Sequence, residues 1–405
     1  MEKTRLRARA GLAALAGLAL IASACGSEPP TSSGADGGTG DDATATEAAT
    51  TPDEGTESEA AQSGGSDAMD NSAALEEVYA QLEGLEGEDR TAKLVELADE
   101  EEGLNIYSST NLDDAEPLLA AFEDKFDIEP NYYRASSSDV LQRILQENDA
   151  NYAGNDVLMA NGPEMALADR EGLLLPLTSP ATEDIIEAGV FDTWASVYVN
   201  TFIAAWNTNE VTDPPATWEE LLTDFDGLLA MELGDWDWFA TITNRYFIEQ
   251  QGMTEEEVVE MFKEAARDAR IVDGHTLMAE LVVAGEYDAG TSLYHHRVAE
   301  FIDEGAPIQW EPPLKPMILR PNGVGIMKAV QNPATALLWT EFLLTDAQTI
   351  LAEDFRGPAS TAVEGGIPEE YEPILVDIDA ITDERDKWEG LWEEIVSQSG
   401  QPVIE

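Results

Sequence analysis

Residues 104–111 read LNIYSSTN, in which a short apolar run leads directly into hydroxyl and amide side chains. A helical pattern of apolar residues follows over 113–126. The same order then recurs twice, with an extended run, a polar turn and a helical pattern at 131–147 and again at 156–171. Strands that alternate with helices at this spacing predict an α/β fold with a mainly parallel sheet.

The pattern continues toward the C-terminus. An apolar, extended stretch stands at 198–206, and helical patterns occur at 218–222, 255–269, 277–284, 333–353 and 383–397. The segment 103–405 is longer than one hydrophobic core usually grows, which is about 250–300 residues. We therefore expect two lobes.

The first 24 residues have the features of a secretory signal peptide. Basic residues between Lys3 and Arg9 precede an apolar run from Ala10 to Ala22, which is too short to span a bilayer, since that takes about 20 residues. Small residues then precede Cys25, the only cysteine of the chain, which has no partner for an internal disulfide. This position resembles the lipidation site of bacterial lipoproteins, so we predict a lipid anchor at Cys25. The alternative is ordinary cleavage nearby with an incidental cysteine.

Residues 25–72 consist almost entirely of small, acidic and hydroxyl residues, and no Lys or Arg occurs between Gly26 and Asp89. Such a segment has too little apolar surface to offset the entropy of ordering, so we expect a disordered acidic tether. Residues 73–102 show helical periodicity, interrupted near 84–87, and are interpreted as a helical segment before the globular part.

The charge of the chain excludes one class of partner. Lys and Arg number 21 against 82 Asp and Glu, which gives a formal net charge of −61. A surface of this sign repels phosphate backbones, so we expect no binding to nucleic acid. It suits a protein that works outside the cell, where salt screens self-repulsion.

Two hydroxyl-rich turns are candidates for a binding site. Ligands in open α/β sheets bind beyond the carboxyl ends of the strands, against helix N-termini. Ser108 and Ser109 follow the first strand, and Ser136, Ser137 and Ser138 follow the second, so both turns belong to one edge of the sheet. Backbone N–H groups, helix dipoles and hydroxyls together favour an anion. The alternative is helix capping by Ser138 or Asp139. Asn161 follows the third strand, where a tight turn chosen for its geometry is an equal explanation.

Two further motifs are candidates for ligand contacts. Residues 234–239 read GDWDWF, and in an extended segment Trp236 and Trp238 would share one side, to which an organic cation or a flat ligand could bind. The alternative is burial in the core. Tyr294, His295 and His296 are consecutive, so at most two of them face one cleft unless a strand ends there. Tyr294 with His295 is a candidate metal or polar-ligand pair, whereas His275 is interpreted as structural.

Catalytic signatures are absent from the sequence. It contains no GxSxG, HExxH or P-loop motif, and its single cysteine lies in the leader. We therefore expect a binding protein that is not an enzyme and carries no cofactor. The alternatives are an exported enzyme on a two-lobed α/β scaffold and a surface adhesin, the latter favoured only by the long tether.

Several of these segments, in this order, resemble the extracellular solute-binding proteins of ABC importers, especially their ferric-iron-type branch. The segments are LNIYSS (104–109), SSSDVLQR (136–143), NDV (155–157), EGLLLP (171–176), YVN (198–200), WNT (206–208), PATWEEL (215–221), GAPI (305–308) and FRGP (355–358).

The resemblance implies a periplasmic-binding-protein type II fold. Such a fold has two α/β lobes, a hinge and an interlobe ligand cleft, and it works as a monomer with an ABC permease and an ATPase. We expect lobe 1 over 103–200, with 311–330 returning to it, and lobe 2 over 201–310, with 331–405 packing on it. The resemblance also implies an extracytoplasmic protein, held at the membrane through its lipid.

The resemblance also bears on the transported solute. Ferric-iron relatives use paired tyrosines from the second lobe, a His or Glu from the first, and an anion at a helix N-terminus. Here the pair falls on Tyr294 and His295 or on His295 and His296, while Ser108, Ser109 and Asn161 stand where the first-lobe ligands would be. Ferric iron favours anionic oxygen donors. We therefore expect a small organic or phosphorylated anion ahead of ferric iron with a synergistic anion.

Overall fold

The protein is described by a computed structural model over residues 69–404. The predicted signal peptide, Cys25 and residues 25–68 of the predicted tether lie outside this range. Within it, no helix combines the length and the apolar composition needed to cross a bilayer.

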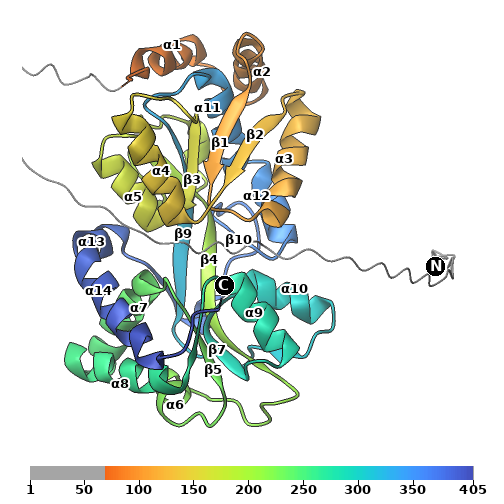
Figure 1. Ribbon diagram of the computed structural model, residues 1–405. Coiled ribbons are helices and arrows are strands. Elements are labelled where there is room, and N and C mark those ends of the chain that lie inside the picture. Colours follow the sequence, from red (N-terminus) through yellow and green to blue (C-terminus); the bar gives the residue numbers. More distant parts are fainter. Residues whose placement is uncertain (1–68, 405) are drawn as a thin grey trace, which may run out of the picture. The chain divides into compact units, whose positions relative to one another are not determined.

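Over residues 69–404, one mixed sheet of eleven strands organises the fold, and the predicted α/β class is confirmed. Its main path has the order β2-β1-β3-β9-β4-β7-β5-β6 (Figure 1). The bounds along this path are β2 (Pro130–Arg134), β1 (Leu104–Ser108), β3 (Val157–Asn161), β9 (Met317–Ile326), β4 (Trp194–Asn207), β7 (Ala289–Tyr294), β5 (Leu229–Glu232) and β6 (Arg270–Val272). Short strands β8 (Ile308–Gln309) and β10 (Gly357–Pro358) pair with β4, and β11 (Pro373–Leu375) pairs with β9.

The pairing changes direction at the two central strands. β1 is parallel to β2 and β3, and β5 is parallel to β6 and β7, whereas β9 and β4 pair antiparallel to each other and to their neighbours β3 and β7. The sheet therefore has two parallel ends joined by one antiparallel pair. In Figure 1, β4 and β9 run through both lobes.

Helices cover both lobes (Figure 1). The first lobe carries α1 (Ser72–Leu82), α2 (Gly87–Ala98), α3 (Leu112–Phe126), α4 (Ser137–Asp149), α5 (Gly162–Arg170), α11 (Pro333–Leu344) and α12 (Ala347–Glu353). The second carries α6 (Trp218–Thr223), α7 (Trp236–Ile242), α8 (Glu255–Asp268), α9 (His275–Ala284), α10 (His295–Asp303), α13 (Ile378–Asp383) and α14 (Arg385–Val396). Of these, α13 also contacts α5 of the first lobe. A π-helical turn (Thr243–Ile248) extends α7, and 3-10 turns stand at Pro180–Thr182, Glu187–Gly189, Glu369–Tyr371 and Ser397–Ser399.

The prediction that residues 331–405 pack on the second lobe is wrong for helices α11 and α12, which pack on the first lobe. Their side chains belong to the first-lobe core, where Trp339 meets Phe122 of α3 edge-on at 5.0 Å between ring centroids. Helix α11 is buried on nearly all its faces, so it needs neighbours on every side. Helices α1 and α2 supply part of this cover, and Arg90 of α2 pairs with Glu341 of α11 at 2.7 Å.

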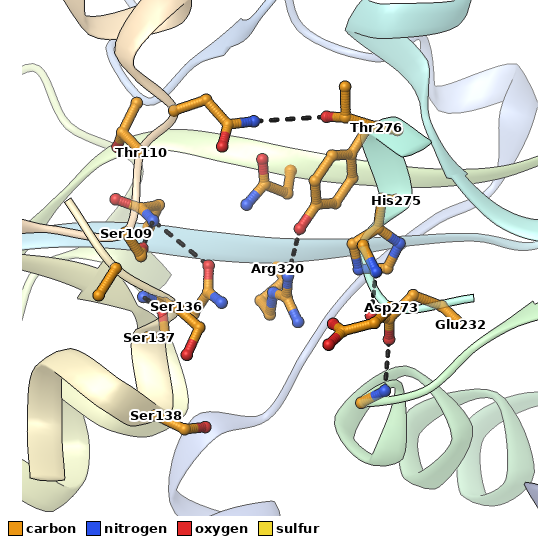
Figure 2. Close-up of a pocket in the computed structure, with 18 of the residues that line it drawn as sticks. Ser109, Thr110, Ser136, Ser137, Ser138, Glu232, Asp273, His275, Thr276 and Arg320 are labelled. Atoms are coloured by element: carbon orange, nitrogen blue, oxygen red, sulfur yellow. Dashed lines mark hydrogen bonds between the residues drawn. The ribbon is translucent and has the colours of Figure 1, made fainter. Parts of the chain in front are cut away.

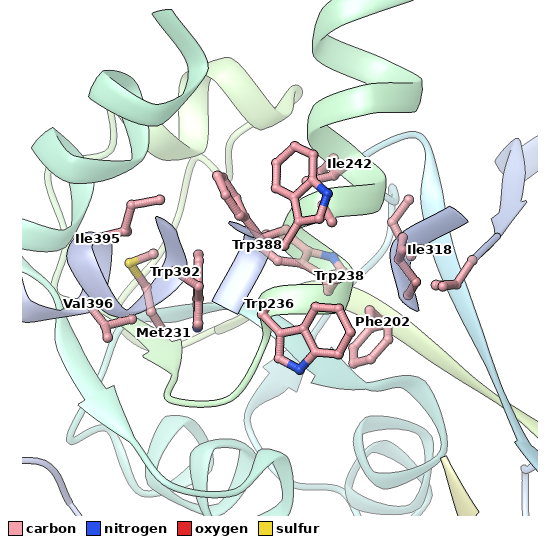
Figure 3. Close-up of a cluster of buried hydrophobic side chains, with 14 of the residues drawn as sticks. Phe202, Met231, Trp236, Trp238, Ile242, Ile318, Trp388, Trp392, Ile395 and Val396 are labelled. Carbon is pink, nitrogen blue, oxygen red and sulfur yellow. The ribbon is translucent and has the colours of Figure 1, made fainter. Parts of the chain in front are cut away.

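Aromatic side chains fill the second-lobe core (Figure 3). Trp238 lies at its centre, fully buried against Trp218, Phe262 and Trp392. The predicted extended form of residues 234–239 is wrong, since Trp236 begins helix α7. In a helix, residues two positions apart do not share a face, so Trp236 and Trp238 point in different directions.

Candidate functional site

A cleft of about 1010 Å³ lies between the lobes, and Figure 2 shows part of its lining. The first lobe contributes the N-terminal ends of α3, α4 and α5. The second contributes the ends of β5 and β7 and the first residues of α7 and α9. The central strands β4 and β9 add Tyr198, Asn200, Arg320 and Asn322.

The start of α4 is built to receive a hydrogen-bond acceptor. Ser136 caps the helix, because its Oγ accepts the backbone N–H of Asp139 at 3.1 Å. The Ser137 hydroxyl accepts the N–H of Asn161 at 3.1 Å and keeps its own proton available. The Ser138 hydroxyl is exposed and has no hydrogen-bond partner within residues 69–404. The first backbone N–H groups of the helix also lack intrahelical acceptors.

Asn322 of β9 ties the ends of two first-lobe strands together. Its Nδ2 lies 3.3 Å from Asn161 Oδ1, at the end of β3, and 3.4 Å from Ser109 Oγ, just after β1. Its own Oδ1 has no hydrogen-bond partner among the described residues. The starts of α3 and α5 are thereby held together, and the contact between Asn161 N–H and Ser137 Oγ adds the start of α4.

Arg320 of β9 places a positive charge in the cleft wall. Its side chain is 6% exposed, and Nη1 donates to Asp237 Oδ2 at 3.0 Å and Oδ1 at 3.1 Å. Its Nη2 donates to the Tyr294 hydroxyl at 2.7 Å, and its Nε has no partner in the described range. Burial raises the pKa of the Tyr294 phenol, so this hydroxyl stays protonated. A buried, charged guanidinium with unused N–H groups can donate to an anion.

A second polar cluster stands at the end of β5. Glu232 accepts the N–H groups of Gly234 and Gly274 at 2.6 and 3.1 Å, and burial raises its pKa to about 7. Beside it, His275 Nδ1 lies 2.8 Å from the carbonyl oxygen of Ser292. Burial lowers the pKa of His275 to about 3, so the imidazole is neutral.

The structure brings most of the predicted ligand contacts into the cleft lining. Those that line it are Ser109, Ser136, Ser137, Ser138, Asn161, Trp236 and Tyr294. Ser108 does not, because it ends β1 and its buried hydroxyl accepts the N–H of Thr110. Trp238 does not, because it is part of the second-lobe core.

The predicted metal pair does not converge. Strand β7 ends at Tyr294 and α10 begins at His295, and this change of direction turns the His295 ring toward Trp310, 4.9 Å away between centroids. Tyr294 faces the cleft, where its hydroxyl is occupied by Arg320. The two side chains therefore do not offer ligands to one ion.

Sequence reasoning missed Arg320, Asn322, Asn200 and Glu232, and it interpreted His275 as structural although its ring lines the cleft. The strand-end rule that found the serines would also have found Glu232, which ends the apolar run 228–232. Strand β9 was not predicted from the sequence because it contains Pro321, and proline is rare inside a sheet. Arg356 stood in the FRGP segment, and it also lines the cleft, paired with Asp114.

The chain matches a known protein family. The family model described as "Bacterial extracellular solute-binding protein" matches residues 118–371, more than half of the chain. No curated protein matches.

Solved structures of low sequence identity share the fold. The periplasmic binding protein AfuA from Actinobacillus pleuropneumoniae, with fructose-6-phosphate bound, is 20% identical with a TM-score of 0.64, over 73% of this chain and 98% of that one. A ferric binding protein from Campylobacter jejuni is 20% identical with a TM-score of 0.60, over 72% and 99%. An ABC-transporter substrate-binding protein from Agrobacterium tumefaciens is 15% identical with a TM-score of 0.64, over 73% and 95%.

Proposed function

The chain belongs to the bacterial extracellular solute-binding proteins, and on this premise we propose that its cleft captures a small organic anion, preferably a phosphorylated one, for an ABC importer. Its partners are then a permease and an ATPase, and it carries out no catalysis of its own.

The observation that carries the proposal is the convergence of three helix N-termini on one cleft. Helices α3, α4 and α5 all begin at its first-lobe wall, and hydroxyl and amide side chains surround these ends. Helix N-termini with free N–H groups bind phosphate and carboxylate groups. Arg320 adds a positive charge in the same cleft.

We prefer a phosphorylated solute to bare ferric iron because the cleft offers hydrogen-bond donors for an anion. The starts of the first-lobe helices offer backbone N–H groups and the hydroxyls of Ser137 and Ser138 to an anion. Ferric iron favours anionic oxygen ligands such as a phenolate, whereas the Tyr294 hydroxyl is protonated and bound to Arg320. The fructose-6-phosphate in the AfuA structure supports the same class of solute, in a protein of this fold. We propose Ser137, Ser138 and Asn161 as contacts of the anionic group, with Trp236 and Tyr294 lining the opposite wall.

Two serines of one turn provide a matched test. Ser138→Ala removes a hydroxyl that the fold does not use, so binding of a hexose phosphate should weaken about 10- to 100-fold, as expected for one hydrogen bond to a charged group worth about 1.5–3 kcal/mol. Ser136→Ala removes the helix cap instead and should lower stability by about 1 kcal/mol. Titration calorimetry and urea unfolding measure the two effects.

A ligand series decides the class of solute. Hexose phosphate should raise the melting temperature in proportion to the logarithm of its concentration, and the unphosphorylated hexose should not. If neither phosphorylated nor carboxylated solutes stabilise the protein, whereas ferric citrate does, the proposal is wrong.

We also propose that Cys25 carries a lipid that holds the protein at the membrane. The supporting observations are the leader-like residues before this cysteine and the extracellular family. Cys25→Ser should move the protein from the membrane fraction to the soluble fraction. Identical fractionation of the variant and the wild type would contradict the anchor.

A further inference from the structure

Three potential metal ligands meet in the second-lobe wall of the cleft. Glu232 ends β5, Asp235 precedes α7 and His275 opens α9. One ligand atom from each lies within 4.8 Å of the other two, and all three residues are buried. Figure 2 shows Glu232 and His275 side by side at this wall.

Neighbouring groups orient each of the three side chains. The contact of His275 Nδ1 with the Ser292 carbonyl at 2.8 Å directs the lone pair of Nε2 toward Asp235. The Ser292 hydroxyl donates to Asp235 Oδ2, and two backbone N–H groups hold Glu232. Metal-binding histidines and carboxylates have such outer partners as a rule.

One atom in this cluster is left without a partner. Asp235 is fully buried, yet its Oδ1 accepts no hydrogen bond from any residue in 69–404. This oxygen lies 3.3 Å from His275 Nε2. Two neighbouring ligands of one ion, each bound at about 2.0–2.2 Å, are about 3 Å apart, so the spacing suits a shared metal.

The charges of the wall also favour a cation. Arg320 forms its ion pair with Asp237, at 3.0 Å. Within the described residues, Glu232 and Asp235 have no Lys or Arg in salt-bridge contact. Buried charges are normally paired or coordinated to a metal. A divalent ion balances two carboxylates.

We propose that Glu232, Asp235 and His275 bind one divalent transition-metal ion of the zinc type. One imidazole and two carboxylates are ligands that Zn²⁺ accepts in proteins, whereas Ca²⁺ and Mg²⁺ prefer oxygen alone. Glu232 and His275 line the cleft, which provides an entry path for the ion. The site is additional to the anion site and does not depend on it.

The test uses the mature protein, stripped with a chelator and titrated with Zn²⁺ in 0.3 M NaCl and excess Mg²⁺, which suppress weak binding to the acidic surface. We expect one Zn²⁺ per chain after gel filtration, measured by elemental analysis, and a higher melting temperature. Co²⁺ in place of Zn²⁺ should give visible absorption bands whose intensity reports a coordination number below six.

Asp235→Asn is the decisive variant. Asparagine removes the negative charge but keeps the size of the side chain, and its N–H₂ group can donate to His275 Nε2. The variant should therefore fold, while its Zn²⁺ affinity falls at least 100-fold. His275→Gln is a second variant with the same expectation. Glu280→Gln is the control, because this exposed carboxylate of α9 lines the same cleft outside the cluster and should leave Zn²⁺ binding unchanged.

Two results would overturn the metal site. One is less than 0.2 Zn²⁺ per chain in the wild type. The other is equal binding in wild type and Asp235→Asn. Either would mean that Asp235 is a neutral acid that donates its proton to His275. Hexose-phosphate binding in the presence of chelator is measured separately, so that failure of the metal site and failure of the anion site are distinguished.

Discussion

Glu164 is a buried carboxylate at the first turn of α5, 4% exposed and at the edge of the cleft. Burial raises its pKa to about 7, although Arg385 lies 3.6 Å away and favours the charged form. Because the pKa is higher in the folded state than in the unfolded chain, this group stabilises the fold most below its unfolded pKa. That contribution is lost as the pH rises toward 7.

Glu164→Gln should therefore stabilise the protein more at pH 8 than at pH 5. The difference between the two pH values should be on the order of 2 kcal/mol, since one pKa unit corresponds to about 1.4 kcal/mol. Urea unfolding of the variant and the wild type at both pH values measures it. The control is Glu389→Gln, which removes a more exposed partner of the same Arg385. A variant gain that is constant with pH would contradict the assignment.

Individual residues of the site could be predicted from the sequence only in part. Ser109, Ser137 and Asn161 were predictable because each follows a short apolar run and precedes a helical pattern. Arg320 and Asn322 were not, because Pro321 stands between them and their strand pairs with segments far away in the chain. Ser136 rather than Asp139 caps α4, a choice that depends on backbone angles and not on residue type.

Among the elements, helix α13 crosses from the second lobe onto α5 of the first. Ile378 of α13 is buried against Gly162, the first residue of α5. A Cβ atom at Gly162 would lie 2.5 Å from Ile378 Cδ1 and 3.2 Å from Pro321 Cγ. This glycine therefore permits close packing at the end of α5 that lines the cleft.

Gly162→Ala should lower the free energy of unfolding by about 1–3 kcal/mol through this overlap. Ile378→Val removes the clashing methyl group, so the double variant should be less destabilised than the sum of the two single variants by more than about 0.5 kcal/mol. Denaturant unfolding of the four proteins gives the coupling. Gly390→Ala in α14 is the control, since its Cβ would meet open space and alanine is the better helix former. Additive effects would contradict the proposed contact.

Helix positions were more predictable than strand positions. The pattern at 255–269 indicated α8 within one residue, because its apolar face and its Thr254–Glu257 capping box are local features. Residues 234–239 were misjudged, because alternation of Trp and Asp over six residues does not separate a strand from the first turns of a buried helix. Packing against aromatic side chains of α6, α8 and α14 stabilises the helical form of this segment.

For the whole molecule, the net charge of −61 makes stability dependent on salt. Like charges repel in the compact state, and the range of this repulsion falls from about 30 Å at 0.01 M salt to about 3 Å at 1 M. The melting temperature should therefore rise with NaCl, steeply below about 0.3 M and little above it. Calorimetry over this series measures the effect. A rise that begins only above 1 M would indicate a general salting-out effect instead of screening.

The two-lobed fold could be predicted because strand–helix alternation and length are properties of the whole chain. The placement of α11 and α12 could not, because both lobes offer apolar surface to a helix of this composition. Which lobe they join depends on α1 and α2, whose cover is visible only after folding.

Strand β4 is continuous over fourteen residues, and its pairing is interrupted twice, between Ser196 and Tyr198 against β9 and between Ile203 and Ala205 against β7. A connection of this kind resists bending elastically, so the two lobes do not rotate freely about it. Bending it stretches hydrogen bonds along the ladder, and the bulges are the most compliant points. Lobe opening then works against a restoring force, so the angle between empty lobes should be narrowly distributed, and lengthening a surface loop should leave that angle unchanged.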